Sequence, residues 1–121
     1  MPFVTITLLE GKSKEYIKAV TDGVNSAVIE TMGFPEDDRY QVVHQVSQDC
    51  CQYQDRTDDR VMMHLVMRSG RSNVSKQQFY KKVAENLANS PGIKPKNLFI
   101  TITENQDVDF SFSDGIAQFV V

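Results

Sequence analysis

The chain has 121 residues, of which 40% are hydrophobic and 24% charged, and its formal net charge is -3. These values are typical of one soluble globular domain that is large enough to bury a core. The acidic balance argues against a nucleic-acid partner, and no apolar run approaches the length of a membrane span. We expect no signal peptide, and the adjacent Cys50 and Cys51 fit a reduced, cytoplasmic protein.

The first eleven residues, MPFVTITLLEG, contain a β-branched and aromatic run that predicts a strand over 3–9. An initiator methionine is usually removed before a small side chain, so Pro2 is expected to become a free secondary amine at the amino terminus. A nearby arginine or burial would lower the pKa of that amine, whereas a nearby carboxylate would raise it. From these residues alone, the simpler interpretation of Pro2 is structural, as a proline at a strand edge.

The next elements follow in clear order. Apolar residues at steps of three and four predict a helix over 14–32, which Gly33 and Pro35 bring to an end. Alternating residues predict a second strand over about 39–47 and a third over roughly 60–68. The polar segment 48–59 between these strands has no periodicity, so it is predicted to be a loop.

A second helix and a fourth strand complete the pattern. Ser75 and Gln78 suggest a capping box for the helix, which Pro91 and Gly92 bring to an end. Its apolar stripe consists of Phe79, Val83 and Leu87. Alternation from Leu98 to Thr103 predicts the last strand, and the tail from Asn105 onward carries three phenylalanines in a polar setting.

The two halves repeat each other at an offset of 59 residues. Gly11 and Gly70 each leave a strand, Gly33 and Gly92 each end a helix, and both pairs are separated by that offset. We therefore predict a single α+β domain over 1–121, with duplicated strand–helix–strand units at about 2–47 and 60–104 and a tail at 105–121. The sheet should have four strands and two helices on one face. Apolar residues in both phases of several strands predict that other copies of the chain cover the second face.

The chain resembles the tautomerase superfamily, and within it the malonate semialdehyde decarboxylase branch. The resemblance runs along the whole chain and rests on four segments taken together, none of them specific alone: MPFVTITLLEG, GFPEDDRYQVVHQ, RSGRSNVSKQQFY and PGIKPKNLFITITENQDVDFSFSDGIAQF. It implies a homotrimer that needs no cofactor and uses its amino-terminal proline as the catalytic group. The implied substrate is a small carboxylic acid.

The resemblance also implies roles for particular residues. Pro2, Asp38 and Arg71 match the catalytic positions, with Asp38 keeping the proline protonated or activating water and Arg71 binding the substrate carboxylate. The implied substrate-binding positions are Arg68, Tyr40, Phe110, Phe112 and Phe119. The family commonly has a second arginine where this chain has Ser69. Arg68 lies one residue earlier, and a slip of one residue moves a strand side chain to the opposite face.

The expected chemistry is proton transfer, hydration or decarboxylation beside a carbonyl of a small oxo or enol acid. Alternatively, the same order of elements describes ferredoxin-like modules that bind small molecules or RNA. The net charge, and the lack of an aromatic and basic motif on the third strand, argue against RNA. A metal site is not expected, since the spacing of His44, Cys50, Cys51 and His64 fits no common zinc pattern.

Overall fold

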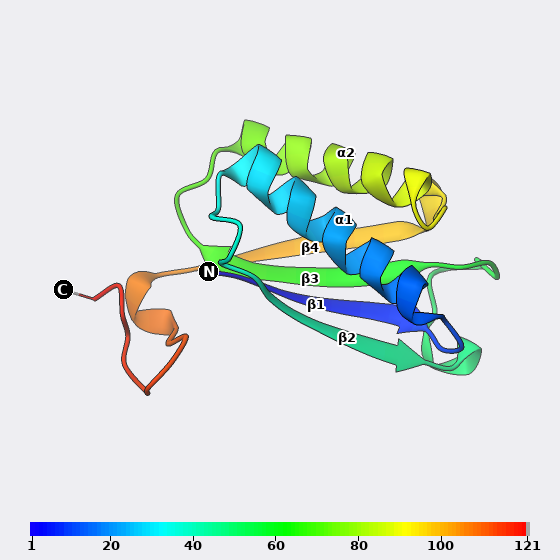
Figure 1. Ribbon diagram of the computed structural model, residues 1–121, viewed down its shortest axis with the longest axis horizontal. Helices are drawn as coiled ribbons and strands as arrows, with labels where there is room; N and C mark the ends of the chain where they lie inside the picture. The colour runs from blue at the N-terminus through cyan, green and yellow to red at the C-terminus, as the bar shows by residue number, and fades with distance from the viewer. Residues whose placement is uncertain (121) are drawn as a thin grey trace.

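The computed structural model describes residues 1–120 and contains one mixed sheet covered on one face by two helices (Figure 1). The strands are β1 (Pro2–Leu9), β2 (Tyr40–Val46), β3 (Val61–Arg68) and β4 (Leu98–Asn105), and the helices are α1 (Lys14–Met32) and α2 (Asn73–Asn89). Short 3-10 helices η1 (Gln48–Cys50), η2 (Pro95–Asn97) and η3 (Asp107–Asp109) lie in the connections and the tail. The predicted four-stranded sheet with two helices on one face is confirmed.

The order of strands across the sheet is β2-β1-β3-β4. β1 is parallel to β2 and β3 is parallel to β4, whereas the central pair β1 and β3 is antiparallel. The start of β1 therefore lies next to the ends of β3 and β4, with Pro2 opposite Met67. By the edge of the sheet at the amino terminus we mean this end of the strands, not an outer strand. This edge brings together the amino terminus, the loop 33–39 and the carboxy-terminal tail (Figure 1).

Alternation along the strands separates a buried face from an open one. Val4, Ile6 and Leu65 are at most 1% exposed beneath the helices, where they pack with the apolar stripes of α1 and α2. The opposite face carries the other phase, including Phe3, Val42 and Phe99, each more than 40% exposed. Burial of the first set supplies the main stabilisation of the fold. In the described chain, no helix is both long and apolar enough to cross a membrane.

The start of α2 differs from the expectation. Ser72 is the N-cap, and its Oγ accepts a hydrogen bond from the backbone N–H of Ser75 at 3.1 Å. The predicted capping box of Ser75 and Gln78 is wrong, because Ser75 already lies in the first helical turn. Ser13 caps α1 in the same way, 59 residues earlier. The duplication of 2–47 in 60–104 stays a prediction, and these equivalent caps agree with it.

Candidate active site

The amino terminus is held by a carboxylate at one edge of the sheet. The Met1 ammonium donates a hydrogen bond to Oδ2 of Asp38 at 2.7 Å. Because β1 and β2 are parallel and Phe3 pairs with Tyr40, the residues that precede both strands meet at this edge. Pro2 is buried as the first residue of β1, and its nitrogen lies only three bonds, about 3–4 Å, from the Met1 nitrogen. Removal of Met1 would thus leave a secondary amine close to Asp38.

Tyr40 adds a neutral hydroxyl beside this carboxylate. Desolvation raises the pKa of Tyr40, and the negative charge of Asp38 and a hydrogen bond to it raise this pKa further. The Tyr40 side chain is on the open face of the sheet, opposite Phe3. The phenol is protonated at neutral pH, as an ordinary tyrosine is, and the raised pKa keeps it so at more alkaline pH; it can therefore donate a hydrogen bond.

A hollow of about 790 Å³ opens next to the amino terminus. Its lining combines the starts of β1 and β2, the last parts of β3 and β4, and the first part of the tail. The lining residues are Met1, Phe3, Arg39, Tyr40, Gln41, Val42, Val66, Asn105, Asp109, Phe110, Ser111 and Phe112. We call it the amino-terminal hollow. Three residues expected at the site, Tyr40, Phe110 and Phe112, thus lie around one cavity with the amino terminus.

The third predicted phenylalanine belongs to the same aromatic cluster but not to this lining. The ring centroid of Phe119 lies 5.6 Å from that of Phe110 and 6.0 Å from that of Phe112. Phe119 itself lines a neighbouring hollow of about 550 Å³ together with Arg68 and Asp107. We call Phe110, Phe112 and Phe119 the aromatic wall, because these rings separate the two hollows.

Arg68 forms an ion pair with Asp107 of the same chain. Its Nε donates to Oδ1 of Asp107 at 2.6 Å and its Nη2 donates to Oδ2 at 3.2 Å. The guanidinium carbon also lies 4.5 Å from the centre of the Phe119 ring. The hydrogen bonds to Asp107 raise the pKa of Arg68 above its ordinary value. Arg68 does not belong to the lining of the amino-terminal hollow.

Arg71 lies at the same edge, beside the end of α1. Its Nε donates to the carbonyl oxygen of Met32 at 3.1 Å, and its guanidinium carbon lies 3.9 Å from the centre of the Phe34 ring. The chain continues from Phe34 through the loop that carries Asp38 (Figure 1). In this single chain, Arg71 lines neither of the two hollows.

Sequence reasoning missed several lining residues. Phe3, Val42 and Val66 are in the strand phase that was expected to need cover, so alternation could have placed them on this face. Nothing in the sequence singled out Asn105. It ends β4, and its buried Oδ1 has no hydrogen-bond partner among residues 1–120.

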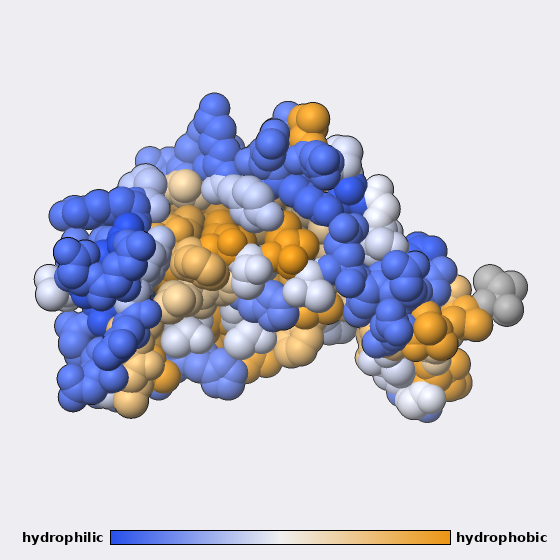
Figure 2. Space-filling model, turned by 180° about the vertical axis from the view of Figure 1, so that it is seen from behind, coloured by the Kyte–Doolittle hydropathy of each residue, from blue (hydrophilic) through white to orange (hydrophobic). Residues whose placement is uncertain are grey.

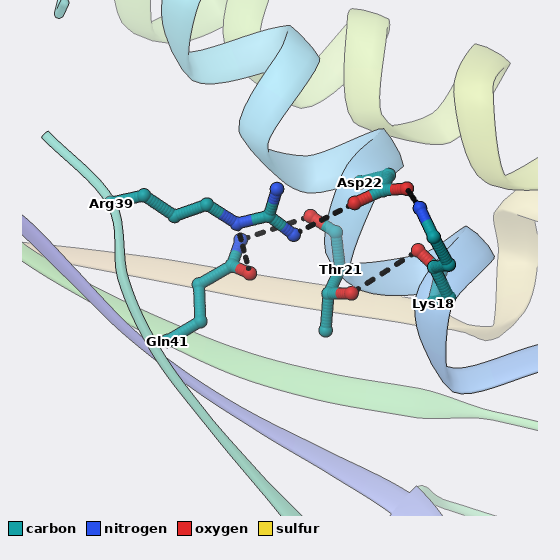
Figure 3. A network of polar contacts seen from close by, with 5 residues as sticks. All are labelled: Lys18, Thr21, Asp22, Arg39 and Gln41. Carbon is teal, nitrogen blue, oxygen red and sulfur yellow. Dashed lines mark hydrogen bonds and ion pairs between the residues drawn. The ribbon is translucent and has the colours of Figure 1, made fainter. Parts of the chain in front are cut away.

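Arg39 contributes to the lining but directs its guanidinium toward α1 (Figure 3). Nε donates to Oε1 of Gln41 and Nη2 to Oδ1 of Asp22, both at 2.9 Å. Asp22 also accepts from Lys18 at 2.6 Å, and the hydrogen bonds from Lys18 and Arg39 lower the pKa of Asp22. Arg39 therefore serves to fasten the edge strand β2 to α1.

Metal coordination finds no support within residues 1–120, where no three His, Cys, Asp or Glu side chains lie close enough together to share an ion. Of the four residues considered from the sequence, His64 instead bonds through Nε2 to Oγ1 of Thr103 at 2.8 Å. Cys51 is buried, with its Sγ 3.9 Å from the sulfur of Met62.

Comparison with known proteins identifies the family. Two protein-family models, both described as tautomerase enzyme, match the sequence, one over residues 38–113 and the other over residues 2–57. Two probable tautomerases of Bacillus subtilis (strain 168), YusQ and YrdN, are 30% and 33% identical to the chain over 126 residues. These alignments cover 99% of this chain and 99% and 97% of the relatives. The chain belongs to the tautomerase family, a family of enzymes.

Solved structures agree with this assignment. The FG41 malonate semialdehyde decarboxylase inhibited by 3-bromopropiolate superposes with a TM-score of 0.90 at 30% identity, covering 97% of this chain and 93% of that one. A second malonate semialdehyde decarboxylase also gives 0.90 at 30% identity, covering 97% and 95%. A fused 4-OT in a symmetric trimer gives 0.84 at 12% identity, covering 94% of each chain, and this likeness shows the fold alone.

Proposed function

We propose that this chain is a cofactor-independent enzyme that uses Pro2, freed by removal of Met1, for chemistry on small oxo or enol carboxylic acids. The observation that carries the proposal is the 2.7 Å contact between the terminal ammonium and Asp38 beside the amino-terminal hollow. Loss of one residue would place the ring nitrogen of Pro2 in the same neighbourhood. An amine there would act as a proton donor or acceptor toward a molecule bound in the hollow.

The carboxylate of Asp38 favours the protonated ring over the neutral one, because a nearby negative charge stabilises the cation. In this form Pro2 would donate a hydrogen bond to the carbonyl oxygen of a 3-oxo acid. The bond to the departing CO₂ breaks and its electron pair forms an enolate. The enolate then takes at carbon the proton of the Pro2 ring nitrogen, and solvent water restores that proton. Alternatively, Asp38 would direct water onto an unsaturated acid. Support comes from the two malonate semialdehyde decarboxylases at 30% identity, one of them described with decarboxylase and hydratase activities.

Arg71 is the proposed anchor for the substrate carboxylate. Its Nε and the face of its guanidinium are engaged by Met32 and Phe34, which fixes the side chain. Among residues 1–120, no hydrogen bond engages its two terminal nitrogens, so the outer edge of the fork can pair with a carboxylate. Arg71 does not line the amino-terminal hollow within one chain, so contact between copies must bring an Arg71 to this hollow. Tyr40, Phe110 and Phe112 would then surround the rest of the substrate. Phe119 supports the two phenylalanines from behind.

We further propose that the chain assembles as a homotrimer and works in the cytoplasm. The open sheet face leaves Phe3, Val42 and Phe99 uncovered, and one structural relative with the same fold forms a symmetric trimer. Contact between copies would also bring further side chains to the edge where the amino terminus lies. Exposed apolar surface of this kind is typical of a protein interface.

The first test joins intact mass with turnover. Untagged protein is expected to lack Met1 and to act on phenylenolpyruvate or on a 3-oxo acid, and Pro2→Ala should lower kcat by at least about a hundredfold, the scale of general acid–base catalysis. Asp38→Asn should shift the basic limb of the pH–rate profile to lower pH, because the proline loses its stabilising anion. Asp37→Asn, at the neighbouring exposed acid, is the matched control.

Two results would count against the proposal. Retained Met1 with no turnover on either compound would leave a binding module of ferredoxin-like architecture. Full turnover by Pro2→Ala would show an enzyme whose chemistry does not depend on the secondary ring amine of proline.

A further inference from the structure

The ion pair of Arg68 and Asp107 connects the sheet to the tail. Arg68 ends β3, and both oxygens of the Asp107 carboxylate accept hydrogen bonds from its guanidinium. A planar fork with two donors fixes the orientation of a carboxylate as well as its distance. The same guanidinium lies over the Phe119 ring, so one side chain contacts both ends of the tail.

Asp107 is placed where the chain leaves the sheet. β4 ends at Asn105, and η3 follows at once, with Oδ2 of Asp109 accepting a hydrogen bond from the backbone N–H of Gln106 at 2.8 Å. Phe110 comes directly after this turn. A contact that fixes Asp107 therefore also fixes the direction in which the aromatic wall leaves the sheet.

We propose that Arg68 is a positioning residue that fastens the aromatic wall through Asp107 and Phe119, and that the hollow thus selects monocarboxylic oxo or enol acids with an apolar or aromatic substituent. This inference rests on the proposed function. It gives Arg68 a role different from binding the substrate carboxylate. Arg68 touches the wall and not the reacting atoms.

The balance of charge at the site supports the substrate class. Asp107 neutralises Arg68, Asp22 neutralises Arg39, and Ser69 stands where the family commonly has a second arginine. Arg71 is then left as the arginine at this edge whose terminal nitrogens are free to bind within the described chain. One anchor suits one carboxylate.

The lining supports the same class of substrate. Apart from the amino terminus, the hollow is lined in part by apolar and aromatic side chains, namely Phe3, Val42, Val66, Phe110 and Phe112. Its polar lining is formed by Arg39, Tyr40, Gln41, Asn105, Asp109 and Ser111. Of these, Arg39 is already paired with Asp22. A second carboxylate placed against the apolar side chains would lose hydration without gaining a partner, and the carboxylate of Asp109 in the same lining would repel it. An aryl or alkyl substituent would instead bury apolar surface there.

The test compares two enol acids, phenylenolpyruvate with one carboxylate and an aryl group, and the enol of oxaloacetate with two carboxylates. Wild type should prefer phenylenolpyruvate. Arg68→Met should raise the KM for phenylenolpyruvate about three- to tenfold, which is the scale expected for the loss of an exposed ion pair together with a cation–π contact. The kcat for this acid should change less than about twofold. The KM for oxaloacetate should stay within about twofold.

Asp107→Asn should reproduce the effect of Arg68→Met, and the double variant should add little, because both residues act through one contact. Arg56→Met is the matched control. Arg56 also stacks on an aromatic ring, that of Tyr53 at 3.9 Å, but lies in the loop before β3 at the opposite end of the sheet. Amide hydrogen exchange over residues 106–120 supplies a readout independent of turnover and should quicken in both tail variants but not in the control.

Three outcomes would overturn the inference. A higher KM for both acids in Arg68→Met, with no effect of Asp107→Asn, would make Arg68 a ligand of the carboxylate. Unchanged exchange in the tail would show that the pair fastens nothing. A wild-type preference for oxaloacetate would remove the substrate class. Failure of the proposed function is distinct from these, since it would appear as full turnover by Pro2→Ala while the exchange result still reports on the tail.

Discussion

Tyr16 lies on α1 at the end of the sheet opposite the amino terminus, beside Lys12 and Asp59. Burial, followed by the charge of Asp59 and a hydrogen bond to it, raises the pKa of Tyr16 from 10.0 to about 12. Lys12 pairs with the same carboxylate and lies 5.1 Å from the centre of the Tyr16 ring. Since the shift raises the pKa of an acid, the folded state keeps its proton where the unfolded chain has lost it.

Stability should therefore be full below pH 10 and fall as the pH rises from 10.0 toward about 12. Tyr16→Phe should reduce this loss of stability by about 1–2 kcal/mol. This value is smaller than the free energy that corresponds to the full pKa shift, because the phenol is partly solvated. Urea unfolding at several pH values measures it, with the exposed Tyr80→Phe as control. Equal slopes for Tyr16→Phe and wild type would show that the phenol titrates normally.

Among single residues, alternation predicted the strand that carries Tyr40, whereas its place at the site was implied by the resemblance to the tautomerase superfamily. In the structure, parallel pairing brings Tyr40 next to Phe3 at the start of β1. The partner of Arg68 could not be predicted in the same way. Asp107 follows the last strand, and its contact with Arg68 depends on how η3 turns the chain, for which periodicity gives no information.

Gly23 of α1 lies directly against α2. A Cβ atom added there would lie 2.9 Å from Cδ2 of Leu87 and 3.4 Å from Cβ of Asn86. Nδ2 of Asn86 donates a hydrogen bond to the carbonyl oxygen of Gly23 at 2.9 Å. Gly23 therefore sets the distance between α1 and α2, and its cost in helix propensity is offset by this packing.

Gly23→Val should destabilise the fold by about 1–3 kcal/mol, because the branched side chain overpacks the contact with the fully buried Leu87. The midpoint of urea unfolding measures this change. Ser26→Val places the same side chain at an exposed position of the same helix and should stay within about 0.5 kcal/mol of wild type. Similar midpoints for the two variants would mean that the helices separate easily at this contact.

The bounds of the helices show what local sequence can and cannot specify. α1 was predicted at 14–32 as observed, since Ser13 caps its start and Gly33 takes the left-handed conformation after its end. α2 starts two residues before the predicted cap. The prediction was wrong because Ser72 and Ser75 are both suitable N-cap residues, and Gln78 has the spacing from Ser75 that a capping box requires. The extended backbone of Ser72 and the hydrogen bond that its Oγ accepts from Ser75 identify the true N-cap.

At the scale of the whole molecule, the face seen in Figure 2 has hydrophobic residues gathered over the body and on the tail that projects from it. The first was expected in outline, since strands with apolar residues in both phases cannot be covered by two helices on one face. The tail was not predictable. It is closed on itself by contacts between particular side chains, such as Gln118 Nε2 with the carbonyl oxygen of Ser113 at 2.6 Å and Phe119 with Phe110.

The open face provides the last prediction, which concerns assembly. Analytical ultracentrifugation of the wild type should give a molecular mass three times the 13.7 kDa of the chain. Phe99→Lys should shift the mass toward that of one chain, because Phe99 is 45% exposed on the open face and a buried ammonium there would lack a partner. Val74→Lys is the matched control, since Val74 is 59% exposed at the start of α2. Dissociation by both variants would locate the interface elsewhere, and a monomeric wild type would mean that the open face meets water.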